Sequence, residues 1–400
     1  MWKYIKDELR PLRGQKLYLF LIIVTILRKT LFNRARAMDA YASVDANNFI
    51  AILATIVMLG IVLFQQTKIK REIRMCNTFF YYYLFAAISV VWAGFQFITI
   101  AGYKAIEVIV SYSMIILVMR NLRNITECFK FVMVSFTFCN VIYLIMGFRS
   151  GLFHDNAFPL LAITQFLLIL GAVRYRLSNW KQMQHHIIIA IVTMILGTST
   201  ASWISLIIGL FFFFSSSKKG VNVGQAIGIG VLFYGIYQLF GDMIYGIVFG
   251  NKTQEMIENG SGRKALWMAY IQGWLESPII GHGFIVGEKG AIAAKYIVFA
   301  TNTSHNMIIS VLVNTGLIGL GLWIAFMWKQ CQICWYYSLR KNAYALTCFP
   351  AIIAMFINAN SFPVIGSEWS PTSIPIYALL IFIFVYIPQS YKKDKRQTVL

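Results

Sequence analysis

Residues 306–328, NMIISVLVNTGLIGLGLWIAFMW, decide the fold, because no charged side chain interrupts this apolar run. A helix of roughly 20 such residues is long enough to cross the hydrocarbon core of a bilayer. Similar runs recur along the chain, and 58% of its 400 residues are hydrophobic while only 12% are charged. At a mean hydropathy of +0.67, too little polar surface exists to cover a soluble globule. The sequence therefore predicts an all-α, polytopic integral membrane protein.

The apolar runs predict about twelve spans in one transmembrane domain, residues 1–400, because backbone polar groups in lipid must be satisfied within helices. The first span is the weakest, since Arg28 and Lys29 would lie at its outer end, so an interfacial or tilted first segment is an alternative. The predicted spans are residues 17–30, 48–66, 78–102, 105–119, 131–147, 157–173, 186–200, 202–215, 222–249, 306–328, 342–359 and 373–389.

The net charge of +20 reflects topology rather than a nucleic-acid surface, because most of the 35 Lys and Arg residues cluster in short connectors. With both termini in the cytoplasm, these connectors lie inside and residues 251–305 form a long outer loop. His185 and His186 then lie on the cytoplasmic side, where we expect them to be solvated or near headgroups. The six cysteines lie inside or within spans, so no disulfide framework is expected.

The outer loop contains a predicted short amphipathic helix from Arg263 to Leu275. Trp267, Tyr270 and Trp274 recur at helical spacing within it, and glycines precede it while Ser-Pro follows it. We interpret these aromatic residues as interfacial anchors rather than sugar-stacking platforms. Arg263 begins the helix, where unpaired N–H groups and the positive end of the helix dipole favour an anion.

Three blocks of this region occur together: residues 260–267 (GSGRKALW), residues 277–284 (SPIIGHGF), and Ser304-His305-Asn306 followed by an apolar helix with GLIG at 316–319. In this order and spacing they resemble the signature region of the O-antigen ligase and polymerase family. The matching patterns are Gly-Arg-x-x-x-Trp, Pro-x-x-Gly-x-Gly-Phe, and His-Asn with a later Gly-x-x-Gly. The resemblance covers Gly262 to about Trp369 well, and the first 140 residues only in hydropathy.

The resemblance implies a GT-C-like glycosyltransferase that moves glycans off undecaprenyl diphosphate at the periplasmic face of the bacterial inner membrane. Such a transfer needs cations or N–H donors for the diphosphate and a base for the acceptor hydroxyl. Arg263, with Lys264 beside it, is the candidate diphosphate ligand, because its planar fork suits phosphate oxygens. His305 is the candidate base, and Asn306 is placed to orient the ring or the substrate.

We expect no metal and no cofactor, because the predicted outer loops contain no Asp-x-Asp, no His pair at i, i+4 and no carboxylate cluster. Protein cations would then assist departure of the diphosphate. Asp242, near the outer end of the ninth predicted span, is a rival base or a partner for Arg263 or Arg149, since ionisable groups in spans are functional candidates by default.

Two weaker resemblances lie upstream. Residues 151–156 look like the family's Gly-x-Phe-x-x-Asn segment, where His154 and Asn156 are either acceptor-sugar ligands or parts of an ordinary polar loop. Residues 197–202 (GTSTAS) stand where many members carry Ser-Arg, and the arginine is missing. Either the hydroxyls of Ser199 and Thr200 or the guanidinium of Arg149 replaces it, or the segment is only a hydroxyl-rich turn.

The missing arginine and the Gly-x-Phe-x-x-Asn segment favour a polymerase of undecaprenyl-diphosphate-linked repeat units. One alternative is the ligase that transfers the polymer to lipid A-core, and one from another class is a lipid-linked oligosaccharide flippase. A carrier is disfavoured because the two halves of the chain show no matched repeat. The expected partners are the lipid-linked donor, the glycan acceptor, membrane lipid, a chain-length regulator and a flippase, and no nucleic acid.

Overall fold

A computed structural model describes residues 2–31, 46–93, 95–147, 157–197, 199–217, 220–221, 263–291, 303–359, 365–370 and 372–398. These residues are helical or connect helices, apart from a short hairpin in which β1 (Ser216–Ser217) pairs antiparallel with β2 (Gly220–Val221). The predicted all-α class is therefore confirmed. The predicted ninth span, residues 222–249, lies outside the described residues.

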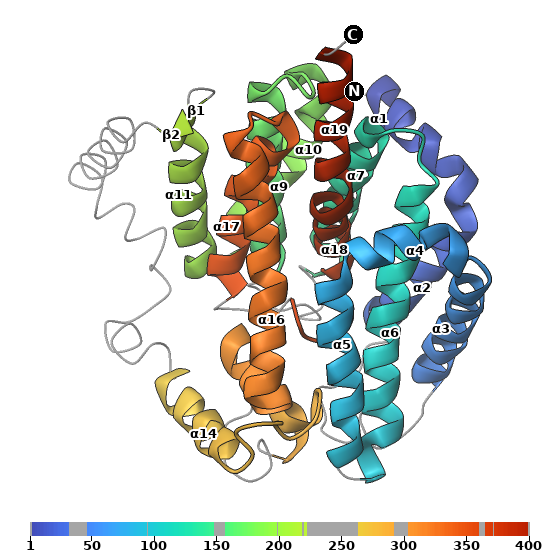
Figure 1. The fold of residues 1–400 in the computed structure, drawn as a ribbon, viewed down its shortest axis with the longest axis vertical. Coiled ribbons are helices and arrows are strands. Elements are labelled where there is room, and N and C mark those ends of the chain that lie inside the picture. The colour runs from blue at the N-terminus through green and yellow to red at the C-terminus, as the bar shows by residue number, and fades with distance from the viewer. Residues whose placement is uncertain are drawn as a thin grey trace.

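The helices form an elongated bundle in which α1 and α19 lie at one end and α14 lies at the opposite end (Figure 1). α9 packs against both α10 and α17, while α16 packs against α5 and α17. The α-helices of the first half are α1 (Trp2–Leu9), α2 (Lys16–Leu31), α3 (Ala46–Phe64), α4 (Gln66–Met75), α5 (Asn77–Ser89), α6 (Phe95–Arg120), α7 (Ile125–Ile142), α9 (Ala157–Arg174) and α10 (Trp180–Leu196). Those of the second half are α11 (Thr200–Ser215), α14 (Arg263–Leu275), α16 (Met307–Leu339), α17 (Ala343–Ala359), α18 (Ser373–Ile381) and α19 (Ile387–Thr398). Short 3₁₀ or π turns are η1 (Arg10–Gln15), η3 (Val90–Trp92), η4 (Tyr143–Gly147), η6 (Gly287–Ala291) and η7 (Phe382–Tyr386).

Several of these helices are suited to a bilayer. Within the described ranges, four are long and apolar enough to cross one: Ala101–Arg120, Ile125–Ile145, Met307–Leu339 and Ser373–Lys392. A bent pair, Phe49–Phe64 with Gln66–Met75, is a fifth candidate, and its halves meet at 94°. α9, α11 and α17 are apolar but shorter. The helices thus support a membrane protein, while the count of twelve spans remains a prediction.

The predicted boundary between the third and fourth spans is wrong. We expected a break near residues 102–105, but α6 runs unbroken through them. The preceding helix, α5, ends instead at Ser89. The reason is an ionic cluster that keeps this polar stretch inside the bundle. Lys104 Nζ lies 3.5 Å from Glu107 and 3.3 Å from Glu368, and the Tyr103 hydroxyl donates to Glu107 at 3.0 Å.

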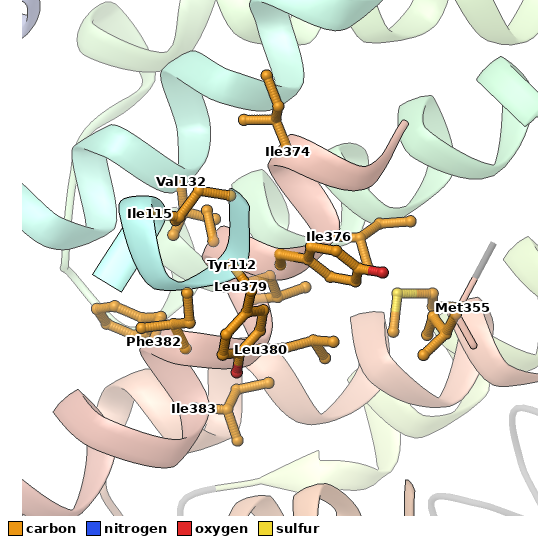
Figure 2. Close-up of a cluster of buried hydrophobic side chains, with 14 of the residues drawn as sticks. Tyr112, Ile115, Val132, Met355, Ile374, Ile376, Leu379, Leu380, Phe382 and Ile383 are labelled. Carbon is orange, nitrogen blue, oxygen red and sulfur yellow. The ribbon is translucent and has the colours of Figure 1, made fainter. Parts of the chain in front are cut away.

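The core centres on α18, whose side chains are buried on every side. Figure 2 shows Leu379 and Leu380 of α18 packed among Tyr112 and Ile115 of α6 and Val132 of α7. A helix that is apolar all round must be covered by other helices, which α6 and α7 do here. This core supports α5 and α16, and α16 contains residues 316–319 of the third sequence block.

Candidate active site

The break in α16 is the first feature that builds the site. Gly316 adopts φ 63° and ψ −164° inside this helix, which leaves neighbouring backbone groups without partners in the helix. The Gly-x-Gly turn at residues 281–283 docks in the break. Four backbone hydrogen bonds join this turn and the two residues Pro278 and Ile279 to α16: Leu317 N to Pro278 O at 2.9 Å, Ile318 N to Ile279 O at 3.1 Å, His282 N to Val313 O at 3.0 Å and Gly283 N to Asn314 O at 2.8 Å.

Glycine is required on both sides of this contact. Gly281 has φ 69°, a left-handed conformation that costs other residues energy. A Cβ on Gly281 would lie 2.6 Å from the Gly316 nitrogen, and a Cβ on Gly316 would lie 2.4 Å from the Ile279 carbonyl. One backbone-to-backbone contact therefore explains Gly281 of the second block and Gly316 of the third, whereas a Cβ on Gly283 would meet Ala93 and a Cβ on Gly319 would meet Thr315.

α14 has the predicted bounds, Arg263–Leu275, and packs against the first turns of α16. Leu266 and Tyr270 form a small apolar cluster with Ile309 and Val313. This cluster fixes the helix that begins with Arg263 against the helix that follows His305.

Trp267 and Trp274 act as internal ties rather than the interfacial anchors that we expected. The indole Nε1–H of Trp267 donates to Ser304 O at 2.8 Å, and that of Trp274 donates to Pro278 O at 3.1 Å. Both side chains are partly buried, and a buried indole N–H needs an acceptor. α14 is thereby bonded to the second block through Trp274 and to the third block through Trp267.

Arg263 is half-buried at the start of α14, with Lys264 next to it. Within the part of the chain that the structure describes, its guanidinium makes no hydrogen bond or ion pair, and no acidic residue stands in the first turn of α14. Burial lowers the pKa of the Arg263 guanidinium from its ordinary value, although an arginine stays charged. A charge held in this way is suited to an incoming anion.

His305 lies in the short connection that leads into α16. It has φ 52°, which is uncommon for a residue other than glycine. The Thr303 hydroxyl lies 3.3 Å from its Nε2 and 3.4 Å from its Nδ1. Asn306 caps α16, because its Oδ1 accepts from the backbone nitrogens of Ile308 and Ile309. The asparagine of the His-Asn pair thus has a structural use, beside the substrate contact that stays a prediction.

Glu288 is a buried acid at this site that the sequence analysis missed. It lies in η6 and is 4% exposed. Its carboxylate accepts from Ser304 N at 2.6 Å, from Ser304 Oγ at 2.7 Å and from Ser310 Oγ at 2.6 Å. The available signal was an acid placed just after the Gly-x-Gly-Phe block, in the same loop as the candidate base.

The upstream candidates are only partly described. Arg149, His154, Asn156 and Asp242 lie outside the described residues, so their roles stay predictions. Ser199 is buried, and its hydroxyl has no hydrogen-bond partner among the described atoms. Thr200 begins α11. The helix that begins at Arg263 packs against the helix that follows His305. The replacement of the missing arginine stays a prediction.

The expectation for His185 and His186 is wrong, because both are buried in α10. Their Nε2 atoms lie 2.9 Å and 3.1 Å from one carboxylate oxygen of Glu8 in α1. Burial alone would raise the pKa of Glu8, but hydrogen bonds from the two histidines outweigh it and lower the pKa to about 2.

In the described ranges, these three residues are the one group whose ligand atoms are close enough to hold a metal ion, all within 4.8 Å. Their direct hydrogen bonds account for the arrangement without an ion.

The comparison with protein families gives one match. Residues 185–324 match the family model described as O-antigen ligase. The matched residues extend from α10 into α16 and contain the three blocks, the turn in the broken helix, and Glu288. No curated protein matches the chain.

Proposed function

We propose that this chain belongs to the O-antigen ligase and polymerase family, whose ligase model matches residues 185–324, and that it is a metal-independent glycosyltransferase that uses a polyprenyl-diphosphate-linked donor. The observation that carries the proposal is the hydrogen bond from Trp267 Nε1 to Ser304 O, 2.8 Å long. It holds the helix that begins with the half-buried Arg263 against the segment that contains His305. A cation and a titratable base are therefore presented on two adjoining elements.

In the proposed reaction, Arg263 and the N–H groups at the start of α14 bind the diphosphate, with Lys264 adding charge. His305 removes the proton from the acceptor hydroxyl as that oxygen attacks the anomeric carbon of the donor. The bond between this carbon and the diphosphate oxygen breaks, and the lipid diphosphate leaves with the electron pair. The guanidinium stabilises the negative charge that develops on the leaving group.

We place this site at the periplasmic face of the bacterial inner membrane, in a GT-C-like bundle of about twelve spans. Support comes from the opposite positions of α14 and the two terminal helices in Figure 1, together with the basic connectors that predict cytoplasmic termini.

Within the family we favour the polymerase, because residues 197–202 lack the arginine and residues 151–156 carry the Gly-x-Phe-x-x-Asn pattern. The ligase that transfers polymer to lipid A-core is the second candidate, and the family match fits it equally well. The match gives no support to a flippase. A polymerase would work with a flippase that delivers its donor and with a chain-length regulator.

The surface glycan of a deletion strain separates these functions. Lipid A-core capped with single repeat units indicates a polymerase, whereas bare lipid A-core with a pool of lipid-linked polymer indicates a ligase. Unpolymerised units that accumulate at the cytoplasmic face would contradict both and indicate a carrier. Complementation with His305→Ala, compared with the parent chain at equal expression, then tests whether the candidate base is required.

A further inference from the structure

The segment from Thr303 to Asn306 needs an external restraint. It has no regular secondary structure, and His305 within it adopts a left-handed φ that costs about 1 kcal/mol or more. A base must be held close to its productive geometry, because a displacement of about 1 Å can cost about 100-fold in rate. Some neighbouring group therefore has to fix this connection.

We infer that Glu288 is a positioning residue that fixes the Ser304-His305-Asn306 connection for catalysis. This inference rests on the proposed function and assigns a role within that same site. The Glu288 carboxylate only accepts hydrogen bonds, and all three of its described contacts are donors. Two of these donors belong to Ser304, the residue immediately before His305. Hydrogen bonds to a charged acceptor are stronger than neutral ones, so this contact is a firm tether.

Glu288 is itself fixed from the two helices that flank the site. Its backbone N–H donates to Asn314 Oδ1 at 2.9 Å, and its carbonyl accepts from the Tyr270 hydroxyl at 3.1 Å. Burial raises the pKa of Tyr270, which keeps this hydroxyl protonated as a donor. Asn314 Nδ2 lies 3.4 Å from Ser310 Oγ, which closes a ring of contacts around the acid. The restraint on His305 thus extends to both α14 and α16.

The next residue ties η6 to the core. Lys289 forms an ion pair with Glu368, and Glu368 also lies 3.3 Å from Lys104 of α6. Through Lys289 and Glu368, η6 is attached to α6. Through the Glu288 carboxylate, it is attached to Ser304, the residue before the candidate base.

The carboxylate acts through His305 rather than on substrate. Glu288 is 4% exposed, and both of its oxygens are engaged by Ser304 and Ser310 at hydrogen-bonding distance. An acid enclosed in this way has little access to an incoming sugar hydroxyl. Its effect should consequently appear as misplacement of the base, with a reduced kcat and a largely unchanged KM.

The test compares Glu288→Ala with Glu288→Gln in purified protein supplied with a polyprenyl-diphosphate oligosaccharide. The alanine variant removes the tether, whereas the glutamine variant keeps an oxygen for Ser304 and turns an NH₂ group toward the Ser310 hydroxyl, which can accept. We expect kcat per folded molecule to fall about 100-fold in Glu288→Ala and by less than about tenfold in Glu288→Gln. The matched control is Glu276→Gln, the same substitution at an exposed acid of the same loop, and it should retain the parental rate.

Amide hydrogen exchange provides a readout independent of activity. The Ser304 N–H donates to Glu288, so residues 303–306 should exchange faster in Glu288→Ala, whereas α18 should stay protected. Parental kcat in folded Glu288→Ala, or unchanged exchange at 303–306, overturns the inference. A glutamine variant as impaired as the alanine variant also overturns it, because the charge and not the tether would then matter. If the parent protein itself transfers no glycan, the proposed function fails, while the exchange experiment still tests the tether.

Discussion

Gly316→Ala should destabilise the protein and inactivate it, although the substitution adds one methyl group within a helix. Gly316 has φ 63° and ψ −164°, a combination that is essentially restricted to glycine. The new Cβ would lie 2.4 Å from both the carbonyl carbon and the oxygen of Ile279. These atoms belong to backbone and cannot move aside as a flexible side chain could.

The expected cost follows from these contacts. Backbone strain at such a position is about 1 to 3 kcal/mol. Separating the two backbones also weakens the four hydrogen bonds between residues 278–283 and the broken part of α16, each worth about 1 kcal/mol. The sum is at least about 3 kcal/mol, which for a chain of this size corresponds to a fall in Tm of about 4 °C or more. Because the same backbones position His305, transfer should fall at least about tenfold.

Gly321→Ala is the matched control. Gly321 lies five residues further along α16, and a Cβ there would meet nothing within 4 Å. Alanine is favoured over glycine in a helix by about 0.5 to 1 kcal/mol, so this variant should melt at the parental temperature or slightly above it. Thermal unfolding in detergent, followed by transfer assays on the folded fraction, distinguishes the two. Parental Tm and activity in Gly316→Ala would refute the account of the broken helix.

Four further predictions concern other groups. Arg263→Lys keeps the charge but loses the two-pronged contact with phosphate, so the transfer rate should fall about 30-fold to 1000-fold; near-normal polymer from well-expressed protein would show that Arg263 is no such ligand. His305→Ala should lower transfer by about 10² to 10⁴-fold with expression intact. His305→Gln should be similarly inactive, because glutamine can accept a hydrogen bond but cannot hold a proton at neutral pH. A parental rate in His305→Gln would show that the residue only positions substrate. The pKa of Glu8 is lowered from 4.5 to about 2, so its ionised form contributes about 3 kcal/mol of stability at most. That stability is present above pH 4.5 and is lost as the pH falls toward 2. The Tm of Glu8→Gln should therefore depend less on pH over that range than the parental Tm does, and an identical dependence would contradict this. A cysteine introduced at exposed Glu276 should react with an impermeant reagent in intact cells whose outer membrane is open, and labelling only after the inner membrane is permeabilised would reverse the proposed orientation.

The parts of the fold that depend on local sequence could be predicted. α14 is described over Arg263–Leu275, the predicted range, and it ends at Leu275 as expected because the Ser-Pro that follows is a local signal. The all-α class followed from the long apolar runs for the same reason.

The parts that depend on distant partners could not be predicted. His185 looked like a solvated residue because its partner, Glu8, is 177 positions away. The continuation of α6 through Lys104 depends on Glu368, far along the chain. Each of these polar groups is stable inside the bundle only because another segment supplies its counterpart.

The sequence offered candidates for the site but not their supports. Arg263 and His305 were proposed from the three blocks and their roles stay predictions, whereas Glu288 was missed because its partners stand 16 and 22 positions later. A single acid in a polar loop carries no sign of burial in the sequence. Its importance is visible only where Ser304 and Ser310 meet it.

The length of α16 bears on where we expect His305 to lie in a membrane. This helix has 33 residues and is kinked at Gly316; a straight helix of that length would measure about 50 Å at 1.5 Å per residue, whereas the hydrocarbon layer is about 30 Å thick. Exposed Trp328, Trp335 and Tyr336 gather toward its far end, as the aromatic residues of a membrane–water boundary do. Measured back from Trp328, a hydrocarbon layer of about 20 helical residues ends near Ile308. On the proposed function, we therefore expect His305 at the opposite boundary, at the level of the headgroups, where the diphosphate of a lipid-anchored sugar would reach water while its hydrocarbon chain stays in the bilayer.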